Sequence, residues 1–381
     1  MASLRLVLVS TAVLLSLAAC SGGHYNNRIP GSYGAYYKSG SQAAKAKDYE
    51  TAAEHYAFAA KSGHPRAVTA YAELFAYGRG VDRDPLKAVA LLENAYGKSS
   101  SAKGKTALTL GRVLLEGGSG PSGEFAANPE RARALLTEAL TSGQVNAASS
   151  LGKIYDKGIG TERDIAKAIS YYQRVAGRSP SGARRHAELL AEAGAPKARI
   201  AEAADNAITL IEERAEGGSS KAWVQLADIY TRGTIIEPDY ERAIGYLEKV
   251  VGEGDTAVYM RLVRLYGKIG DDQREREMLQ LAADADDVKA QTKLARLFLK
   301  AGTADTNGPV GRYYAERAIG KGNTSAMVYL GAALIRGDVL TADPQTGETL
   351  LRRASEVGHV SGKSALGAAI LRGKITGRSA D

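Results

Sequence analysis

Few residues in this sequence are placed to do chemistry. Cys20 is the only cysteine among the 381 residues, so the chain can form no intramolecular disulfide. The five histidines are scattered and include no pair at the spacing of a helical metal site. The glycine-rich stretch 117–123 lacks the lysine that a phosphate-binding loop requires. The sequence therefore predicts no enzyme activity, no metal site and no cofactor, and it indicates no catalytic residue.

Basic side chains form a candidate binding site. The chain has 50 Lys and Arg against 42 Asp and Glu, a formal net charge of +8. Five cations occupy equivalent places in the helical repeat described below: Lys157, Arg232, Lys300, Arg336 and Arg372. Two explanations stay open. The dipole of a helix favours a cation near its C-terminus by about 0.3–1 kcal/mol. Alternatively, the five form a basic strip on a concave wall that binds an anionic polymer or an acidic partner.

The N-terminus is predicted to be a targeting segment. Arg5 precedes an apolar run from Leu6 to Leu17 that is too short to span a bilayer comfortably, which is typical of a signal peptide over residues 1–19. The sequence Leu17-Ala18-Ala19-Cys20 resembles the lipobox of bacterial lipoproteins. This resemblance implies lipidation of Cys20 and attachment to the membrane through the lipid, and Ser21 implies sorting to the outer membrane. The alternative is a plain signal peptide with a lone cysteine nearby.

The elements that position these residues are repeated helices. Within 147–160, Ala147, Leu151, Gly152 and Tyr155 recur at helical spacing, and Gly158 is a helix stop. A second amphipathic helix follows from Asp164. Equivalent first helices begin at small residues spaced 33 to 41 apart: Ala67, Thr106, Ala147, Gly182, Ala222, Ala257, Ala290, Ala326 and Gly362.

Stacking of these helical hairpins is required to build a core. Small residues allow close approach of the paired helices, and no hairpin can bury its apolar face alone. We therefore expect an all-α, right-handed superhelical solenoid of stacked helical hairpins. Three second helices begin with an Asn-Pro or Asp-Pro pair, at Asp84, Asn128 and Asp343, which suits a helix cap. Two copies, 182–217 and 257–287, lack the turn glycine, and the long loop 117–128 should protrude.

The expected domains follow from this pattern. Residues 20–40 comprise the lipidated cysteine and a flexible tether, because the stretch is rich in Gly, Ser, Asn and Tyr without helical periodicity. Its tyrosines either meet the membrane interface, pack on the first repeat or remain in a disordered linker. The repeat solenoid covers 41–375, and 376–381 is a C-terminal tail.

Two segments carry a family resemblance. Tyr155 to Gly160 followed by Asp164, and Tyr77 to Asp82 followed by Asp84, resemble the hallmark of the Sel-one-like repeat, a relative of the tetratricopeptide repeat. The resemblance covers roughly 41–375. It implies a scaffold for protein partners, because helical solenoids offer long concave surfaces.

The combination of a lipobox, a short tether and repeats is similar to the scaffold lipoproteins of alginate-type exopolysaccharide secretion. That resemblance implies an outer-membrane β-barrel porin and periplasmic polysaccharide-modification proteins as partners, on the periplasmic face. One alternative is direct binding of an anionic polysaccharide or glycan. Another is a secreted or surface-exposed repeat protein that engages regulatory or host partners. Nucleic acid is not expected as a partner outside the cytoplasm.

Overall fold

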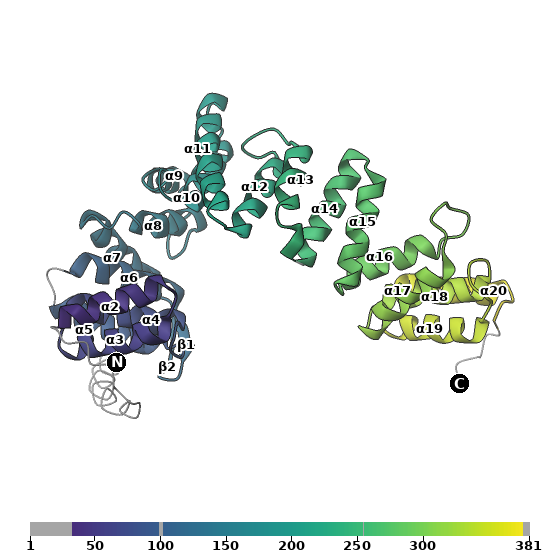
Figure 1. Cartoon of the computed structure of the whole chain (residues 1–381), viewed down its shortest axis with the longest axis horizontal. Coiled ribbons are helices and arrows are strands. Elements are labelled where there is room, and N and C mark those ends of the chain that lie inside the picture. Colours follow the sequence, from purple (N-terminus) through teal and green to yellow (C-terminus); the bar gives the residue numbers. More distant parts are fainter. Residues whose placement is uncertain (1–32, 99–101, 254, 376–381) are drawn as a thin grey trace. The chain divides into compact units, whose positions relative to one another are not determined.

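The computed structural model describes residues 33–98, 102–253 and 255–375 (Figure 1). These residues form α-helices in consecutive hairpins, together with one short 3-10 helix and one two-stranded hairpin. The predicted all-α stack of helical hairpins is therefore confirmed. Within the described part of the chain, no helix combines the length and apolarity needed to cross a membrane. The predicted signal peptide, Cys20 and the tail 376–381 lie outside the described residues and stay predictions.

The chain divides into two compact units, residues 1–210 and 211–381. The first unit holds α2 (Tyr33–Lys45), α3 (Tyr49–Lys61), α4 (Pro65–Tyr77), α5 (Pro85–Lys98), α6 (Lys103–Glu116), β1 (Gly118–Gly120), β2 (Gly123–Phe125), α7 (Pro129–Thr141), α8 (Ala147–Lys157), α9 (Ile165–Gln173) and α10 (Pro180–Glu192). The boundary falls inside α11 (Lys197–Glu216).

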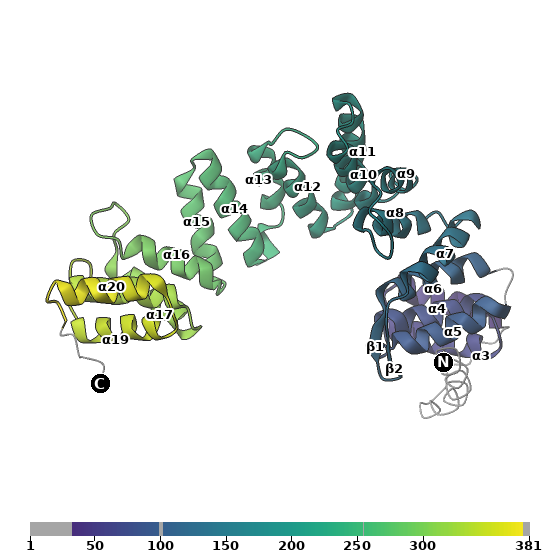
Figure 2. The same ribbon diagram turned by 180° about the vertical axis from the view of Figure 1, so that it is seen from behind.

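The second unit continues from the end of α11. It holds α12 (Ser220–Arg232), α13 (Tyr240–Glu248), the 3-10 helix at Val251–Glu253, α14 (Thr256–Ile269), α15 (Asp272–Asp284), α16 (Val288–Phe298), α17 (Gly308–Gly320), α18 (Thr324–Arg336), α19 (Pro344–Glu356) and α20 (Val360–Leu371). Figure 2 shows the same helices from behind.

Polar caps and left-handed glycines set the helix ends, as the sequence predicts. The Asp164 carboxylate accepts a hydrogen bond from the Lys167 amide at 2.9 Å, and Asn128 accepts one from the Arg131 amide at 3.0 Å. These side chains satisfy amides that a helix start leaves unpaired. Gly158 ends α8 with φ at 65°, a conformation that costs glycine little.

Small residues lie where paired helices approach most closely. A Cβ atom added at Gly331 of α18 would lie 2.9 Å from the carbonyl oxygen of Gly347 in α19, and one added at Gly152 of α8 would lie 3.0 Å from the Tyr172 ring in α9. Buried Leu and Ala side chains fill the space around these contacts. The predicted role of Gly152 and Gly331 in helix contacts is therefore confirmed.

The predicted tether is too long. Helix α2 begins at Tyr33, so residues 33–40 are helical and pack on the first repeat. Tyr36 is buried with its ring 4.2 Å from that of Phe58, and the Tyr37 ring stacks on His64 at 4.8 Å. Aromatic contacts stabilise this helix. Tyr36 and Tyr37 therefore pack on the first repeat, which is one of the three predicted possibilities for the tyrosines.

The turn glycines of the two weak copies are displaced and not missing. In the copy at 257–287, Gly270 ends α14 with φ at 77°, two positions later than the repeat pattern predicts. In the copy at 182–217, Gly194 adopts φ at 68° one position late. The following helix α11 has 20 residues, against 9 to 14 for the other α-helices that the structure describes.

The loop 117–128 does not simply protrude. It forms the antiparallel hairpin β1–β2, in which Gly118 pairs with Phe125. The hairpin lies back on α5 of the preceding repeat, where the Ser122 hydroxyl donates to the Asp84 carboxylate at 2.5 Å. A Cβ at Gly120 would lie 2.7 Å from the carbonyl oxygen of Arg83. The glycines therefore allow the hairpin to cover the start of α5.

Candidate functional site

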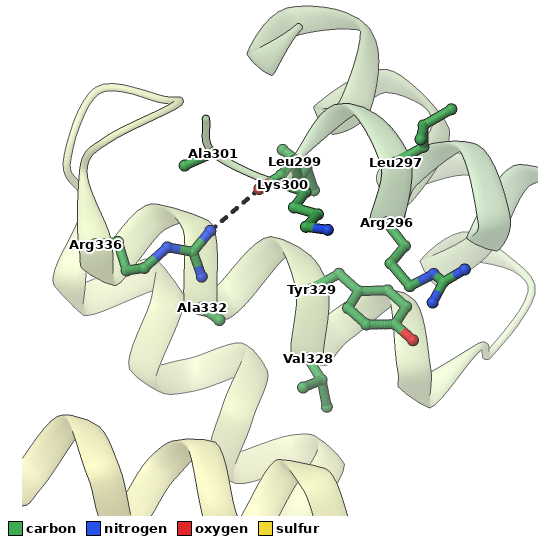
Figure 3. Close-up of a pocket in the computed structure, with 9 residues that line it drawn as sticks. All are labelled: Arg296, Leu297, Leu299, Lys300, Ala301, Val328, Tyr329, Ala332 and Arg336. Atoms are coloured by element: carbon green, nitrogen blue, oxygen red, sulfur yellow. Dashed lines mark hydrogen bonds between the residues drawn. The ribbon is translucent and has the colours of Figure 1, made fainter. Parts of the chain in front are cut away.

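A cationic pocket lies between the first helices of two neighbouring hairpins in the second unit. Its volume is about 490 Å³, within the range of about 300–1,000 Å³ typical of ligand pockets. Helix α16 and the residues after it form one side, and α18 forms the other (Figure 3). The lining residues are Arg296, Leu297, Leu299, Lys300, Ala301, Val328, Tyr329, Ala332 and Arg336.

Two capped helices position these side chains. The Asp287 carboxylate caps the start of α16, and the Asn323 side chain caps the start of α18. Arg296 lies in the last turn of α16, and Lys300 follows two residues after the end of the helix. Leu299 is buried against Gly311 of α17, which fixes the turn that carries Lys300. The pocket wall is thus held by the packing of the hairpin itself.

Arg336 is held in place on two sides. Its Nη2 donates to the carbonyl oxygen of Leu299 at 3.1 Å (Figure 3). Its Nε donates to the Asp338 carboxylate at 3.0 Å. The guanidinium is therefore oriented across the pocket, with one carboxylate already beside it.

Arg296 and Lys300 have no such carboxylate. Both are exposed, and the described residues provide no ion pair or side-chain hydrogen bond for either. Three cations and one carboxylate therefore meet at this pocket. An excess of like charge beside an apolar wall favours binding of an anion.

The equivalent junction in the first unit is closed by internal ion pairs. Between α8 and α10, the Asp156 carboxylate accepts hydrogen bonds from Arg185 at 2.6 and 2.8 Å. Asp156 is only 2% exposed, and Arg163 lies 3.5 Å away. Hydrogen bonds from Arg185 hold the pKa of this carboxyl below its ordinary value, against the opposing effect of burial.

Two further junctions are also occupied by the chain's own groups. Between α12 and α14, Arg261 forms an ion pair with Asp228. Between α6 and α8, Arg112 donates to the Ser150 hydroxyl at 3.4 Å. Of these four junctions, that between α16 and α18 is the one where two exposed cations have no hydrogen-bond partner for their side chains among the described residues.

The five cations predicted as a strip have different surroundings. All five are exposed near helix ends. The structure brings Lys300 and Arg336 together at the pocket, but Arg232 on α12 and Arg372 after α20 do not line it. Lys157 belongs to the first unit. The continuous strip stays a prediction.

Sequence reasoning missed Arg296. It lies one helical turn before Lys300, and this spacing could have linked the two residues. Tyr329 was missed as well, because it occupies a position that does not repeat as an aromatic residue.

The histidines next to the turn glycines are structural. His64 Nδ1 accepts from the Ala67 amide at 3.2 Å, and His359 Nδ1 accepts from the Gly362 amide at 3.3 Å. Across the described ranges, no group of three or more His, Cys, Asp or Glu side chains could hold a metal ion.

Comparison with a family model places six repeats on this fold. The model described as Sel1 repeat matches residues 32–64, 65–98, 145–176, 221–250, 288–323 and 324–359, together just over half of the chain. Each match covers one hairpin, and the last two supply α16 and α18. The hairpin of α6 and α7 and that of α14 and α15 have the same architecture without a match.

A solved structure shows the same fold. The chain is 22% identical to c5321, a protective antigen of uropathogenic Escherichia coli with an SLR fold, over 91% of this chain and 74% of that chain, with a TM-score of 0.52. A Sel1 repeat protein from Oxalobacter formigenes is 18% identical over 93% of this chain and 99% of that chain, with a TM-score of 0.48. No curated protein matches the sequence.

Proposed function

This chain belongs to the Sel1 repeat family, and on that premise we propose that it is a lipid-anchored scaffold that holds protein partners at the outer membrane. Sel1 repeats generally mediate protein–protein interactions. The observation that carries the proposal is the pocket between α16 and α18, where Arg296 and Lys300 face an apolar wall without a carboxylate partner of their own. Such a surface binds a ligand through charge and apolar contact.

The location rests on the N-terminal sequence. Cys20 follows Leu17, Ala18 and Ala19, which resembles a lipobox. Thirteen peptide steps separate Cys20 from the start of α2 at Tyr33, and even a fully extended chain of that length spans at most about 45 Å. A lipid on Cys20 would therefore keep the first unit close to the periplasmic face of the outer membrane.

The partners follow from the same resemblance. A lipid-anchored repeat scaffold fits a role in assembling an alginate-type exopolysaccharide secretion complex. Its partners would be the outer-membrane β-barrel porin and periplasmic polysaccharide-modification proteins. An acidic surface on one of them would match the cationic pocket.

Direct binding of an anionic polysaccharide is the second candidate, because the same three cations could meet uronate groups. A secreted or surface-exposed chain that engages regulatory or host partners is the remaining alternative. A scaffold should retain a membrane or periplasmic protein from a membrane extract, whereas a polysaccharide-binding chain should retain polysaccharide and a surface-exposed chain should retain neither.

Affinity capture from detergent-solubilised membranes tests the scaffold. We expect the wild-type chain to fractionate with the outer membrane and to retain a β-barrel protein or a periplasmic enzyme. The Cys20→Ala variant should leave the membrane fraction. The double variant Arg296→Glu/Lys300→Glu should lose the partner but keep its location, whereas Lys289→Glu, about two turns before Arg296 on the same helix α16 and outside the pocket lining, should keep both.

Other outcomes of this capture would contradict the proposal. Retention of polysaccharide without any protein would favour the second candidate. An unchanged outer-membrane location of Cys20→Ala would exclude the lipid anchor.

A further inference from the structure

We infer that the pocket between α16 and α18 binds a short peptide segment in which an acidic side chain is next to an apolar one, and that the charge of Asp338 beside Arg336 weakens this binding. The inference deepens the proposed function, because it specifies the part of a partner protein that the scaffold would recognise. It follows from the charges, the apolar lining and the bonding of Arg336.

The charges select an anion and place it. Arg296 and Lys300 approach from the α16 side, and Arg336 approaches from the α18 side (Figure 3). A carboxylate between the two sides would meet guanidinium and ammonium donors at once, and such charge-assisted hydrogen bonds are about twice as strong as neutral ones. A junction in the first unit shows such a pairing within the chain, where the Asp156 carboxylate accepts a hydrogen bond from Arg185 at 2.6 Å.

The rest of the lining selects an apolar side chain beside that carboxylate. Between the cations lie aliphatic side chains and the ring of Tyr329, which is half-buried. Of the aliphatic lining residues, Leu297, Ala301 and Ala332 are exposed or half-buried, whereas Leu299 and Val328 are buried in the core behind them. Removing apolar surface from water contributes about 25 cal/mol per Å². A peptide with a leucine-like side chain gains this contribution. A polyuronate has carboxylates but no apolar side chain, so it leaves this part of the wall in water.

Asp338 already occupies part of the anion site. Both of its carboxylate oxygens lie near Arg336 Nε, at 3.0 and 3.3 Å. Asp338 accepts only from Nε and the Leu299 carbonyl from Nη2, so an incoming carboxylate can use the remaining N–H donors of the guanidinium, but it then lies close to the like charge of Asp338. The Asp338 charge therefore lowers the affinity for acidic segments, and it favours ligands that also fill the apolar wall.

Fluorescence anisotropy of the full chain with four labelled probes tests the inference. The first probe is an eight-residue peptide with alternating Asp and Leu. The second replaces Asp with Asn, the third replaces Leu with Ser, and the fourth is an oligouronate with the same number of carboxylates as the first. We expect the Asp-Leu peptide to bind and each of the other three to bind about tenfold more weakly or worse, from the loss of charge-assisted bonds or of apolar burial.

Single substitutions assign the binding to this pocket. Arg296→Gln and Lys300→Gln should each lower the affinity for the Asp-Leu peptide about tenfold, and Asp338→Asn should raise it several-fold. All three changes in affinity should be smaller at high salt. Lys289→Gln on α16 is the matched control and should change nothing. These side chains are exposed or half-exposed, so circular dichroism should report the same helix content for every variant.

Several results would overturn the inference. These are equal binding of the Asn-Leu and Asp-Leu peptides, stronger binding of the oligouronate, no binding of any peptide, or an Asp338→Asn variant with lower affinity. The proposed function is judged separately by membrane capture. If the chain retains a partner that the Arg296 and Lys300 variants do not release, the scaffold stands and this pocket assignment fails. If the peptide binds but membranes yield no partner, the pocket assignment stands and the scaffold fails.

Discussion

Replacing Asp156 with alanine should destabilise the first unit by about 3 kcal/mol. The change removes a buried carboxylate that accepts two hydrogen bonds from Arg185. Breaking a buried pair costs about 3–5 kcal/mol because the remaining charge loses its partner. We expect the lower end because Arg185 keeps Glu188 at 3.0 Å. Urea unfolding followed by circular dichroism at pH 7 measures the effect.

The matched control is Asp228→Ala. Asp228 forms the equivalent ion pair with Arg261 at another junction, but its side chain is 26% exposed. Pairs in contact with water contribute about 0–1 kcal/mol, so this variant should change little. Equal losses of stability in the two variants would show that the buried ion pairs of Asp156 stabilise the fold no more than the more exposed pair of Asp228.

The effect of Asp156 should also depend on pH. Hydrogen bonds from Arg185 lower the pKa of Asp156 in the folded chain, whereas an aspartate in the unfolded chain titrates at about 3.9. The stabilisation is therefore complete above the unfolded pKa and is lost as the pH falls through the lower folded pKa. The difference in stability between wild type and Asp156→Ala should be constant from about pH 5 to 7 and should shrink below about pH 4. A difference that grows on acidification would contradict this assignment.

Gly331→Leu should destabilise the second unit by about 3 kcal/mol, the upper end of the usual cost of overpacking. A Cβ atom at this position would lie 2.9 Å from the Gly347 carbonyl oxygen and 3.2 Å from the Leu350 Cβ. Backbone cannot move aside as a flexible side chain can, so α18 and α19 must separate. Thermal and urea unfolding of the purified variant measure the loss.

Gly367→Leu is the control because Gly367 has the position in α20 that Gly331 has in α18. A Cβ at Gly367 would meet nothing within 4 Å. Leucine is also a better helix former than glycine by about 0.5–1 kcal/mol, so this variant should be as stable as wild type or slightly more so. Comparable losses at both sites would mean that the glycine contact of α18 with α19 does not limit packing.

The sequence was sufficient to predict the hairpins because the same physical requirement recurs in each. Gly158, Gly233 and Gly337 end helices at one repeat position, and small residues such as Gly331 mark the closest contacts. A local pattern that recurs at one period specifies helix ends and helix pairing together.

The start of the fold was less predictable. Residues 33–40 resemble a linker by composition, and the helix there depends on contacts of Tyr36 and Tyr37 with the rings of Phe58 and His64, 22 and 27 residues later. The hairpin β1–β2 likewise depends on Asp84 and Arg83 of the preceding repeat. Contacts of this kind override local propensity and have no periodic signal.

The candidate site could be predicted only in part. The periodic cations included Lys300 and Arg336. Whether such a cation is available to bind a ligand, however, depends on whether a carboxylate of the chain lies beside it. Arg336 is paired with Asp338, two residues away, whereas Arg185 is paired with Asp156, 29 residues away. Sequence spacing alone does not distinguish paired cations from the unpaired Arg296 and Lys300.

The most direct test of the scaffold is photo-crosslinking in cells from position 329. A photoreactive phenylalanine derivative in place of Tyr329 puts the reactive group in the wall of the pocket, and the same residue in place of Lys289 puts it on an exposed part of α16. We expect irradiation to join the chain to a protein of the outer membrane or periplasm from position 329 and not from position 289. An adduct from position 289 alone, or none from either position while the chain remains folded and membrane-bound, would contradict a scaffold that works through this pocket.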